Sequence, residues 1–461
     1  MSIMTAPNDT TNQTPEPQRA PTNSTTKRQW LRAGLLGIGW MSLAQFACLA
    51  IRLGSNLILT RLLAPEVYGI LGTAMAVVTM FEWLSDLGIQ TTLVRHPKGG
   101  QRTFLLTGWW LGLGRAVMIA LLGASAAWPL ASGYSAPALF VVLLVLSTRP
   151  LLYALRSPGI HLLKRELNYR SLFLEEVAQT AVGTIVSLSV AYFFASIWAI
   201  VVGTVAGTIT AVVASYLLCP MRLEWAWNRE ASKELVTVGG RILVNTLVMA
   251  AWLNIDRLLG LWFVPVKEMG LYFVALNLAA VGEGFLARTC DVHYSMLARL
   301  PNLQAQMDWH KQMKARLVFW GSPLLILGVI TAPTVIRILY DPRYWSAGVL
   351  FGVFAARVAV RFVGQFHFQF CLIQAKVFGT TIAYAFAVAL QCALMPVMCS
   401  ELGVFGLALS TLMSTATVTL IQAIFVWWQY GFGLRSTLLV IGSTTVATIL
   451  VWKLAETWEL M

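Results

Sequence analysis

Long apolar runs alternate with short polar segments along most of the chain. We predict membrane-spanning helices at 38–60, 69–88, 103–127, 137–155, 171–195, 197–219, 236–263, 269–290, 317–338, 346–372, 377–398, 404–428 and 436–455. Each run is close to the roughly 20 residues that a helix needs to cross a bilayer. In lipid the backbone must satisfy its own hydrogen bonds, so such runs are expected to be helical. The pattern predicts an all-α polytopic membrane protein of about 12–14 helices.

Composition agrees with this fold class. Hydrophobic residues make up 57% and charged residues 11% of the 461 residues, too little charge to cover a soluble protein. The six cysteines show no metal-ligand spacing, and no nucleotide-binding motif is present, so we expect no metal, ATP or other cofactor. Residues 1–34 are rich in Thr, Pro, Asn and Gln without a signal-peptide core, which predicts a disordered cytoplasmic tail.

The distribution of Lys and Arg predicts the orientation of the spans. With the N-terminus in the cytoplasm, the outside segments hold only Arg61, Lys267, Arg337, Arg343 and Lys453. Cytoplasmic loops of membrane proteins are enriched in basic residues. These loops account for most of the net charge of +13, so no nucleic-acid partner is expected. The position of the C-terminus stays open, because it depends on whether the last run is a span.

A weak internal repeat divides the chain. The segments 61–69 (RLLAPEVYG) and 257–270 (RLLGLWFVPVKEMG) each join an outward span to the next inward one, although chance could produce such short turn motifs. We predict an N-terminal six-helix bundle and a C-terminal one with a substrate site between them. The boundaries are 35–220 for the first bundle, 221–235 for a cytoplasmic loop, 236–430 for the second bundle, and 431–461 for an additional helix and tail.

Four short motifs, each of low specificity alone, occur in the order and at the helix positions found in a known family. They are 61–69 after a span holding Asn56, 86–89 (DLGI) followed by 94–95 (VR), 163–170 (LKRELNYR), and 256–259 (DRLL) with 270–272 (GLY). This set is similar to polysaccharide flippases of the multidrug/oligosaccharidyl-lipid/polysaccharide exporter superfamily. The likeness covers roughly residues 40–430.

The resemblance implies a function as well as a fold. Members have two six-helix bundles around a central cavity. They move undecaprenyl-pyrophosphate-linked oligosaccharides from the cytoplasmic to the periplasmic leaflet by alternating access. This implies a bacterial inner-membrane protein of lipopolysaccharide or exopolysaccharide synthesis. Its partners would be the lipid-linked oligosaccharide, membrane lipid, and a glycan polymerase with export machinery.

Arginines inside the spans are the first candidates for substrate binding, since a charge at bilayer depth is costly. Arg357, Arg361 and Gln365 lie four residues apart and share one helix face. Their helix has no Asp or Glu, and a pyrophosphate would suit two guanidinium forks. The alternative is that another helix supplies a carboxylate, such as Glu283, and the pair is structural.

The N-terminal half offers further candidates. Arg52, on one face with Asn56, and Arg115 could line the same cavity or pair with Glu82 or Asp86. Arg149 is explained by snorkelling to the cytoplasmic interface.

Carboxylates and one histidine complete the candidate residues. Glu283, Glu82 and Asp86 are candidates for binding a coupling proton or sodium ion, and coupling to the membrane potential is the alternative. His367, with no second ligand at helical spacing, is interpreted as a packed core histidine.

Two rival functions remain. A membrane glycan polymerase or glycosyltransferase would need acidic or metal-binding groups outside, but the outside loops are short and carry little acid. A cation-coupled drug or small-molecule exporter of the same superfamily would favour an acidic cavity. The surplus of intramembrane arginine over carboxylate favours an anionic substrate, and therefore a transporter of lipid-linked sugar rather than an enzyme.

Overall fold

The computed structural model describes residues 24–84, 93, 97–166, 168–297, 300, 302–374 and 378–457, and every regular element there is a helix. The first half contains α1 (Ser24–Leu62), α2 (Pro65–Leu84), η1 (Pro97–Gly100), α4 (Arg102–Gly133), α5 (Pro137–Ser147), α6 (Arg149–Ala154), α7 (Ile160–Arg165), α8 (Tyr169–Phe194) and α9 (Trp198–Leu218). The second contains α10 (Arg229–Phe263), α11 (Val266–Leu297), α12 (Leu303–Leu339), η2 (Pro342–Tyr344), α13 (Ala347–Ile373), α14 (Phe378–Tyr430) and α15 (Leu434–Thr457).

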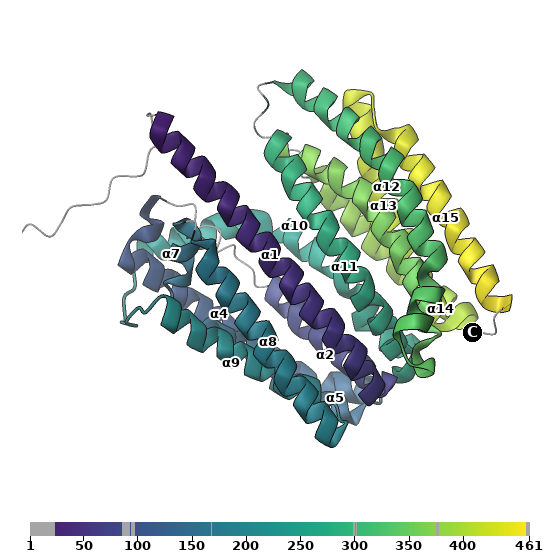
Figure 1. Ribbon diagram of the computed structural model, residues 1–461, viewed down its shortest axis with the longest axis horizontal. Helices are drawn as coiled ribbons and strands as arrows, with labels where there is room; N and C mark the ends of the chain where they lie inside the picture. Colours follow the sequence, from purple (N-terminus) through teal and green to yellow (C-terminus); the bar gives the residue numbers. More distant parts are fainter. Residues whose placement is uncertain are drawn as a thin grey trace, which may run out of the picture.

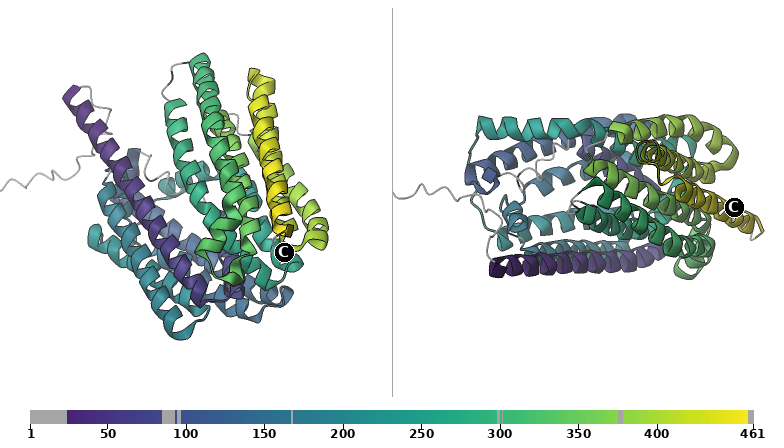
Figure 2. Two further views of the ribbon diagram at one scale, coloured as in Figure 1. Left: turned by 45° about the vertical axis from the view of Figure 1, so that its right-hand side comes forward. Right: turned by 90° about the horizontal axis from the view of Figure 1, so that it is seen from above.

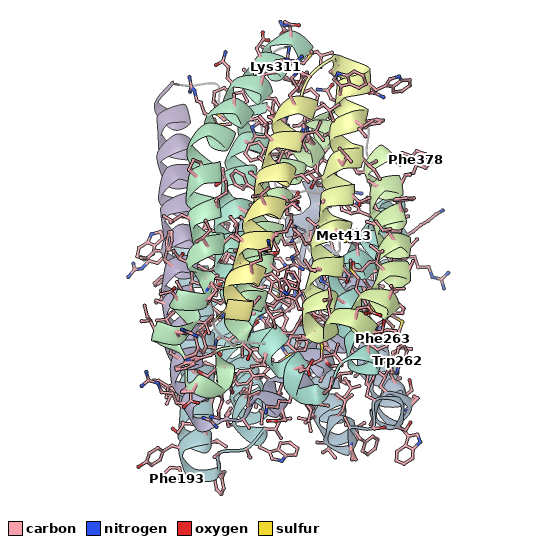
Figure 3. The ribbon with its side chains drawn as sticks, turned by 90° about the vertical axis from the view of Figure 1, so that its right-hand side faces the viewer. Phe193, Trp262, Phe263, Lys311, Phe378 and Met413 are labelled. Atoms are coloured by element: carbon pink, nitrogen blue, oxygen red, sulfur yellow. The ribbon has the colours of Figure 1, made fainter. Side chains whose placement is uncertain are left out.

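Length and hydropathy support a multi-pass membrane protein. Within the described ranges, 9 helices are long and apolar enough to cross a membrane. That figure counts α14 once, although it bends at Gly403 (φ 55°, ψ −137°), between the predicted spans 377–398 and 404–428. Large apolar side chains such as Phe193 (76% exposed) and Phe378 (79%) cover the outside of the molecule (Figure 3), as a lipid-facing surface requires.

Several helices extend beyond the predicted spans. Residues 24–34, predicted to belong to a disordered tail, are the start of α1. Residues 229–235, predicted as loop, are the first turns of α10, capped by Asn228, whose side chain accepts a hydrogen bond from Ala231 N. Hydropathy detects only the lipid-embedded part of a helix, so polar extensions such as the beginning of α12 escape it.

The helices form two groups that converge at one end. In the first group α1 packs on α8, α8 on α9, and α4 on α5; in the second, α13 packs against α11, α12, α14 and α15 (Figure 1). Helix α2 joins the groups by packing on α10 and α11. Figure 2 (left) shows the groups spreading apart toward the top of the view and meeting near its bottom.

The α13 helix is the core of the second group. Its 18-residue apolar window is 78% buried, against 33% or less in the other candidate spans. Any ionisable side chain on α13 therefore needs a partner from a neighbouring helix.

The converging end is the one predicted to be outside, and we call its contacts the outer contact. Asn56 Nδ2 donates to Tyr340 Oη (3.0 Å). Tyr344 Oη donates to the carbonyl of Leu63 (2.8 Å), and Arg343 Nη2 donates to that of Arg61 (2.9 Å). Lys311 and Phe193 lie at opposite ends of the molecule (Figure 3), as the alternation of the predicted spans requires.

One exposed acid–base pair belongs to the outer contact. Asp341 Oδ1 accepts hydrogen bonds from Arg343 Nε (2.9 Å) and from its backbone N (3.0 Å). The side-chain hydrogen bond is the main cause that holds the pKa of Asp341 below its usual value. A lowered carboxyl pKa gives a contribution that is complete at neutral pH and is lost only as pH falls through that pKa. We therefore expect this pair to be unchanged across the neutral range.

The two repeat segments meet in the outer contact. A Cβ added at Gly270 would lie 1.7 Å from the carbonyl oxygen of Pro65, and one at Gly69 would lie 2.3 Å from that of Val266. Both obstacles are backbone atoms, which cannot move aside alone. The glycines of the repeat thus allow α2 and α11 to touch.

Replacing Gly270 by alanine is expected to push α2 and α11 apart. Overpacking of this kind costs about 1–3 kcal/mol, so the unfolding temperature of the purified protein should fall. Gly112→Ala on α4 is the matched control, because no atom lies within 4 Å of its added Cβ. Equal unfolding temperatures for the two variants would show that the outer contact is not close-packed.

Candidate functional site

A cavity of about 850 Å³ lies among α1, α2, α4, α6, α7, α8 and α10, on the predicted cytoplasmic side of the outer contact. It lies mostly within the first group, because only Thr246 and Met249 of its described lining come from the second, whereas the sequence predicted a site between the bundles. We call it the chamber. Its charged lining consists of Arg52, Arg115, Arg149, Arg156, Glu82, Glu175 and Glu176. Arginine thus exceeds carboxylate among the described lining residues. The surplus is one charge, four arginines against three glutamates, so the chamber is polar and slightly basic and has room for a group of small-molecule dimensions.

Two of the chamber arginines are held in place. Arg156 forms an ion pair with Glu175, and its guanidinium carbon lies 4.4 Å from the ring centroid of Tyr153. Arg115 Nη2 donates to the backbone carbonyl of Glu82. Arg52, in contrast, is exposed toward the chamber, and Arg149 is half-buried. The arrangement combines fixed guanidinium groups with accessible ones.

Local structure explains why Arg149 and Arg156 reach the chamber. Helix α5 ends at Ser147, and α6 restarts at Arg149 with Pro150 in its first turn. The loop after α6 is anchored to α9, since Ser157 N donates to Ser215 Oγ (2.9 Å). Trp109 Nε1 donates to the carbonyl of Arg156 (2.9 Å). Arg149, explained from the sequence by snorkelling, instead lines the chamber, because the break at Thr148 is invisible to hydropathy.

The α13 arginines have a carboxylate partner from α11. Arg357 Nη2 lies 2.9 Å from Glu283 Oε1, and Arg361 Nη1 lies 2.8 Å from Glu283 Oε2. Arg361 also lies over Trp252, with 5.5 Å from its guanidinium carbon to the ring centroid. The sequence alternative of a structural pair with Glu283 is the one that the geometry forms. The sequence pattern of α13 alone could not show this pairing, because Glu283 lies 74 residues from Arg357 along the chain.

The remaining candidates are placed as follows. Asn56 belongs to the outer contact and not to the chamber lining, because its amide binds Tyr340. Gln365 is half-buried on α13. Glu82 lines the chamber, while Asp86 lies outside the described residues. Across the described residues, no group of three or more His, Cys, Asp or Glu is arranged to hold a metal ion.

Comparison with known families decides the relationship. Residues 58–349 match the family model described as polysaccharide biosynthesis protein. The chain belongs to this family. A search of curated protein sequences gave no match. The match begins within α1 and includes the chamber-lining residues from Glu82 to Met249, while Arg52 precedes it.

Solved structures show the fold of this family member. A multidrug resistance MATE family transporter of the MOP superfamily, in an inward-facing conformation, aligns with TM-score 0.66 and 12% identity, over 90% of this chain and 99% of its own. The lipid II flippase MurJ, inward closed, aligns with TM-score 0.68 and 11% identity, over 91% and 99%. An outward-facing MATE transporter aligns with TM-score 0.57 and 14% identity, over 90% and 96%. The predicted all-α polytopic membrane fold of two helical bundles is confirmed.

Proposed function

We propose that this protein is a flippase that carries a polyprenyl-pyrophosphate-linked oligosaccharide from the cytoplasmic to the periplasmic leaflet. The single observation that carries the proposal is the arginine-rich chamber on the cytoplasmic side of a closed outer contact. Membership in a polysaccharide biosynthesis family and a transporter fold support it. The flippase would work in the bacterial inner membrane, beside the glycan polymerase and export machinery that use its product.

The pyrophosphate would bind in the chamber. Arg52, Arg115, Arg149 and Arg156 offer planar guanidinium donors, which suit phosphate oxygens. Polar side chains such as Gln179 and Thr246 line the same chamber and would face the sugars. The polyprenyl tail would stay in lipid, since burying it in a charged chamber has no benefit. We assign no direct phosphate contact to Arg357, Arg361, Gln365 or Asn56.

Transport then requires the outer contact to open. The bonds of Asn56, Tyr344 and Arg343 to the opposite group of helices would break while the cytoplasmic ends of the groups close. Glu82 and Asp86 remain the candidate carboxylates for proton or sodium coupling. Glu283 is already bound by two guanidinium groups, which leaves it little capacity for a coupling ion in this conformation.

A reconstituted assay separates this function from its rival. Proteoliposomes receive a fluorescent polyprenyl-pyrophosphate disaccharide in both leaflets, and an impermeant reductant quenches the outer leaflet. A flippase is expected to bring nearly all of the probe to the quencher within minutes, whereas empty vesicles retain about half. Ethidium efflux is measured in the same vesicles. Ethidium transport without lipid exchange would replace the proposal with the drug-exporter function.

A further inference from the structure

A buried amine lies at the predicted cytoplasmic end of the C-terminal helices. Lys314 on α12 is 4% exposed. Its Nζ donates to the carbonyl of Gly433 (2.7 Å) and to Thr437 Oγ1 (2.8 Å), and it lies 2.8 Å from His367 Nε2. Gly433 and Thr437 belong to the turn before α15 and to its first turn. Lys314 and His367 therefore attach the start of α15 to α12 and α13.

Two further imidazoles extend this cluster. His293 Nε2 lies 3.1 Å from His310 Nδ1, and the rings of His310 and His367 are 5.5 Å apart. All three histidines are at most 1% exposed. Each has one ring nitrogen without a partner in the described structure: His293 Nδ1, His310 Nε2 and His367 Nδ1. The cluster is thus a continuous row of buried basic groups. When Lys314 donates to His367 Nε2, neutral His367 carries its hydrogen on Nδ1, and one of the two outer nitrogens of the His293–His310 pair has a free lone pair that can bind a proton.

The neighbouring elements add no balancing acid to this row. On α12, Lys311 lies over Phe432 (5.0 Å to the centroid) and exposed Asp308 is bonded to Gln304. Helix α14 contributes Tyr430, and α15 contributes exposed Arg435. Among the described side chains, no carboxylate bonds to Lys314 or to the three histidines. Since buried like charges repel, the cluster can hold few protons at once.

We propose that Lys314, His367, His310 and His293 form a reversible proton-binding site, and that its occupancy controls the attachment of α15 to α12 and α13. The ammonium form has three N–H donors for three acceptors. When the proton leaves to water, the neutral amine still donates to Gly433 and can accept from the Thr437 hydroxyl. The amine of Lys314 keeps its hydrogen bonds in either form, so it can bind and release one proton without a change in its surroundings.

The direction of the effect follows from burial. Lys314 and His310 precede the predicted span 317–338, and burial lowers the pKa of Lys314 from 10.5 to about 7. If detachment of α15 exposes the amine to water, its pKa returns toward the ordinary value. The detached form then binds the proton more tightly, so acid favours detachment. The effect develops between those two pKa values and levels off below about pH 7.

Hydrogen exchange of the full-length protein in nanodiscs tests this site. After correction for the intrinsic pH dependence of exchange, the opening constant for amides of 434–440 should rise roughly tenfold per pH unit from pH 9 toward pH 7. It should then level off. Amides of 405–412 in α14 should show no such rise. A flat wild-type profile for 434–440 would overturn the proposal.

Two lysine variants on α12 test whether Lys314 is the group that causes the pH dependence. Lys314→Met removes the titrating amine and should abolish the pH dependence, whereas Lys311→Met, one turn away and exposed, should retain the wild-type slope. An unchanged slope in Lys314→Met would also overturn the proposal. If Lys314→Met does not fold, the comparison of the wild-type pH profiles of 434–440 and 405–412 still tests the proposal.

Discussion

Replacing Arg52 by alanine is expected to reduce flipping of a pyrophosphate-linked sugar by roughly 10–100-fold. A hydrogen bond to a charged group contributes about 1.5–3 kcal/mol, which corresponds to that range. Arg52 is exposed in the chamber, so its removal should leave the unfolding temperature unchanged. Arg149→Ala should behave similarly, and the fluorescent-lipid assay measures both rates.

The matched control for these variants is Arg102→Ala. Arg102 is an exposed arginine (53%) that pairs with Glu224 at 2.7 Å, and it does not line the chamber. Its loss should leave flipping within about twofold, because exposed ion pairs contribute little. Lysine at position 52 should recover part of the rate, since it restores charge but not the bidentate fork. Equal rates in Arg52→Ala and Arg102→Ala would exclude the chamber as the phosphate site.

The substitution Glu283→Gln should cause the largest loss of stability. It would remove the carboxylate that forms the described ion pairs with buried Arg357 and half-buried Arg361. Breaking a buried pair in this way costs about 3–5 kcal/mol. We expect a strongly lowered unfolding temperature and little protein in the membrane. The matched control is Glu224→Gln, because Glu224 lies in an exposed loop and its loss should leave the unfolding temperature nearly unchanged. Glu176 is unsuitable as a control because it lines the chamber.

Removing all three charges separates structure from binding. A variant with Glu283→Leu, Arg357→Met and Arg361→Met should recover folding, since apolar residues often replace a buried ion network without loss. It should also retain flipping, because we place phosphate in the chamber. A folded triple variant that binds no substrate would return Arg357 and Arg361 to the role that their spacing suggested.

Much of the fold follows from hydropathy because the bilayer imposes it. The predicted spans fall on helices where the structure describes them, although 137–155 is divided between α5 and α6 and 69–88, 269–290 and 317–338 are not among the nine helices counted as long and apolar enough to cross a membrane. The bend between 377–398 and 404–428 occurs at Gly403. Gly69 and Gly270 of the two repeat segments lie where the backbones of α2 and α11 approach each other closely. The ends of the helices were harder to predict, because polar extensions such as 303–316 of α12 lie outside the hydrophobic run that hydropathy detects.

The site was less predictable because side-chain partners come from distant helices. Because α13 contains no Asp or Glu, the sequence suggested that Arg357 and Arg361 bind an anionic substrate. In the structure Glu283 on α11 supplies the negative charge. Conversely, Arg149 and Arg156 sit at the break after α5 and in the anchored loop, positions that hydropathy assigns to an interface. Arg52 and Arg115 were singled out from the sequence and do line the chamber. Their role there is a proposal.

The central claim is that phosphate binds in the chamber. A structure determined with a polyprenyl-pyrophosphate saccharide bound would test it most directly. We predict phosphate oxygens within hydrogen-bond distance of Arg52, Arg115 or Arg149, with the Glu283 ion pairs intact. Phosphate held by Arg357 and Arg361 with Glu283 displaced, or a head group bound elsewhere, would contradict the account.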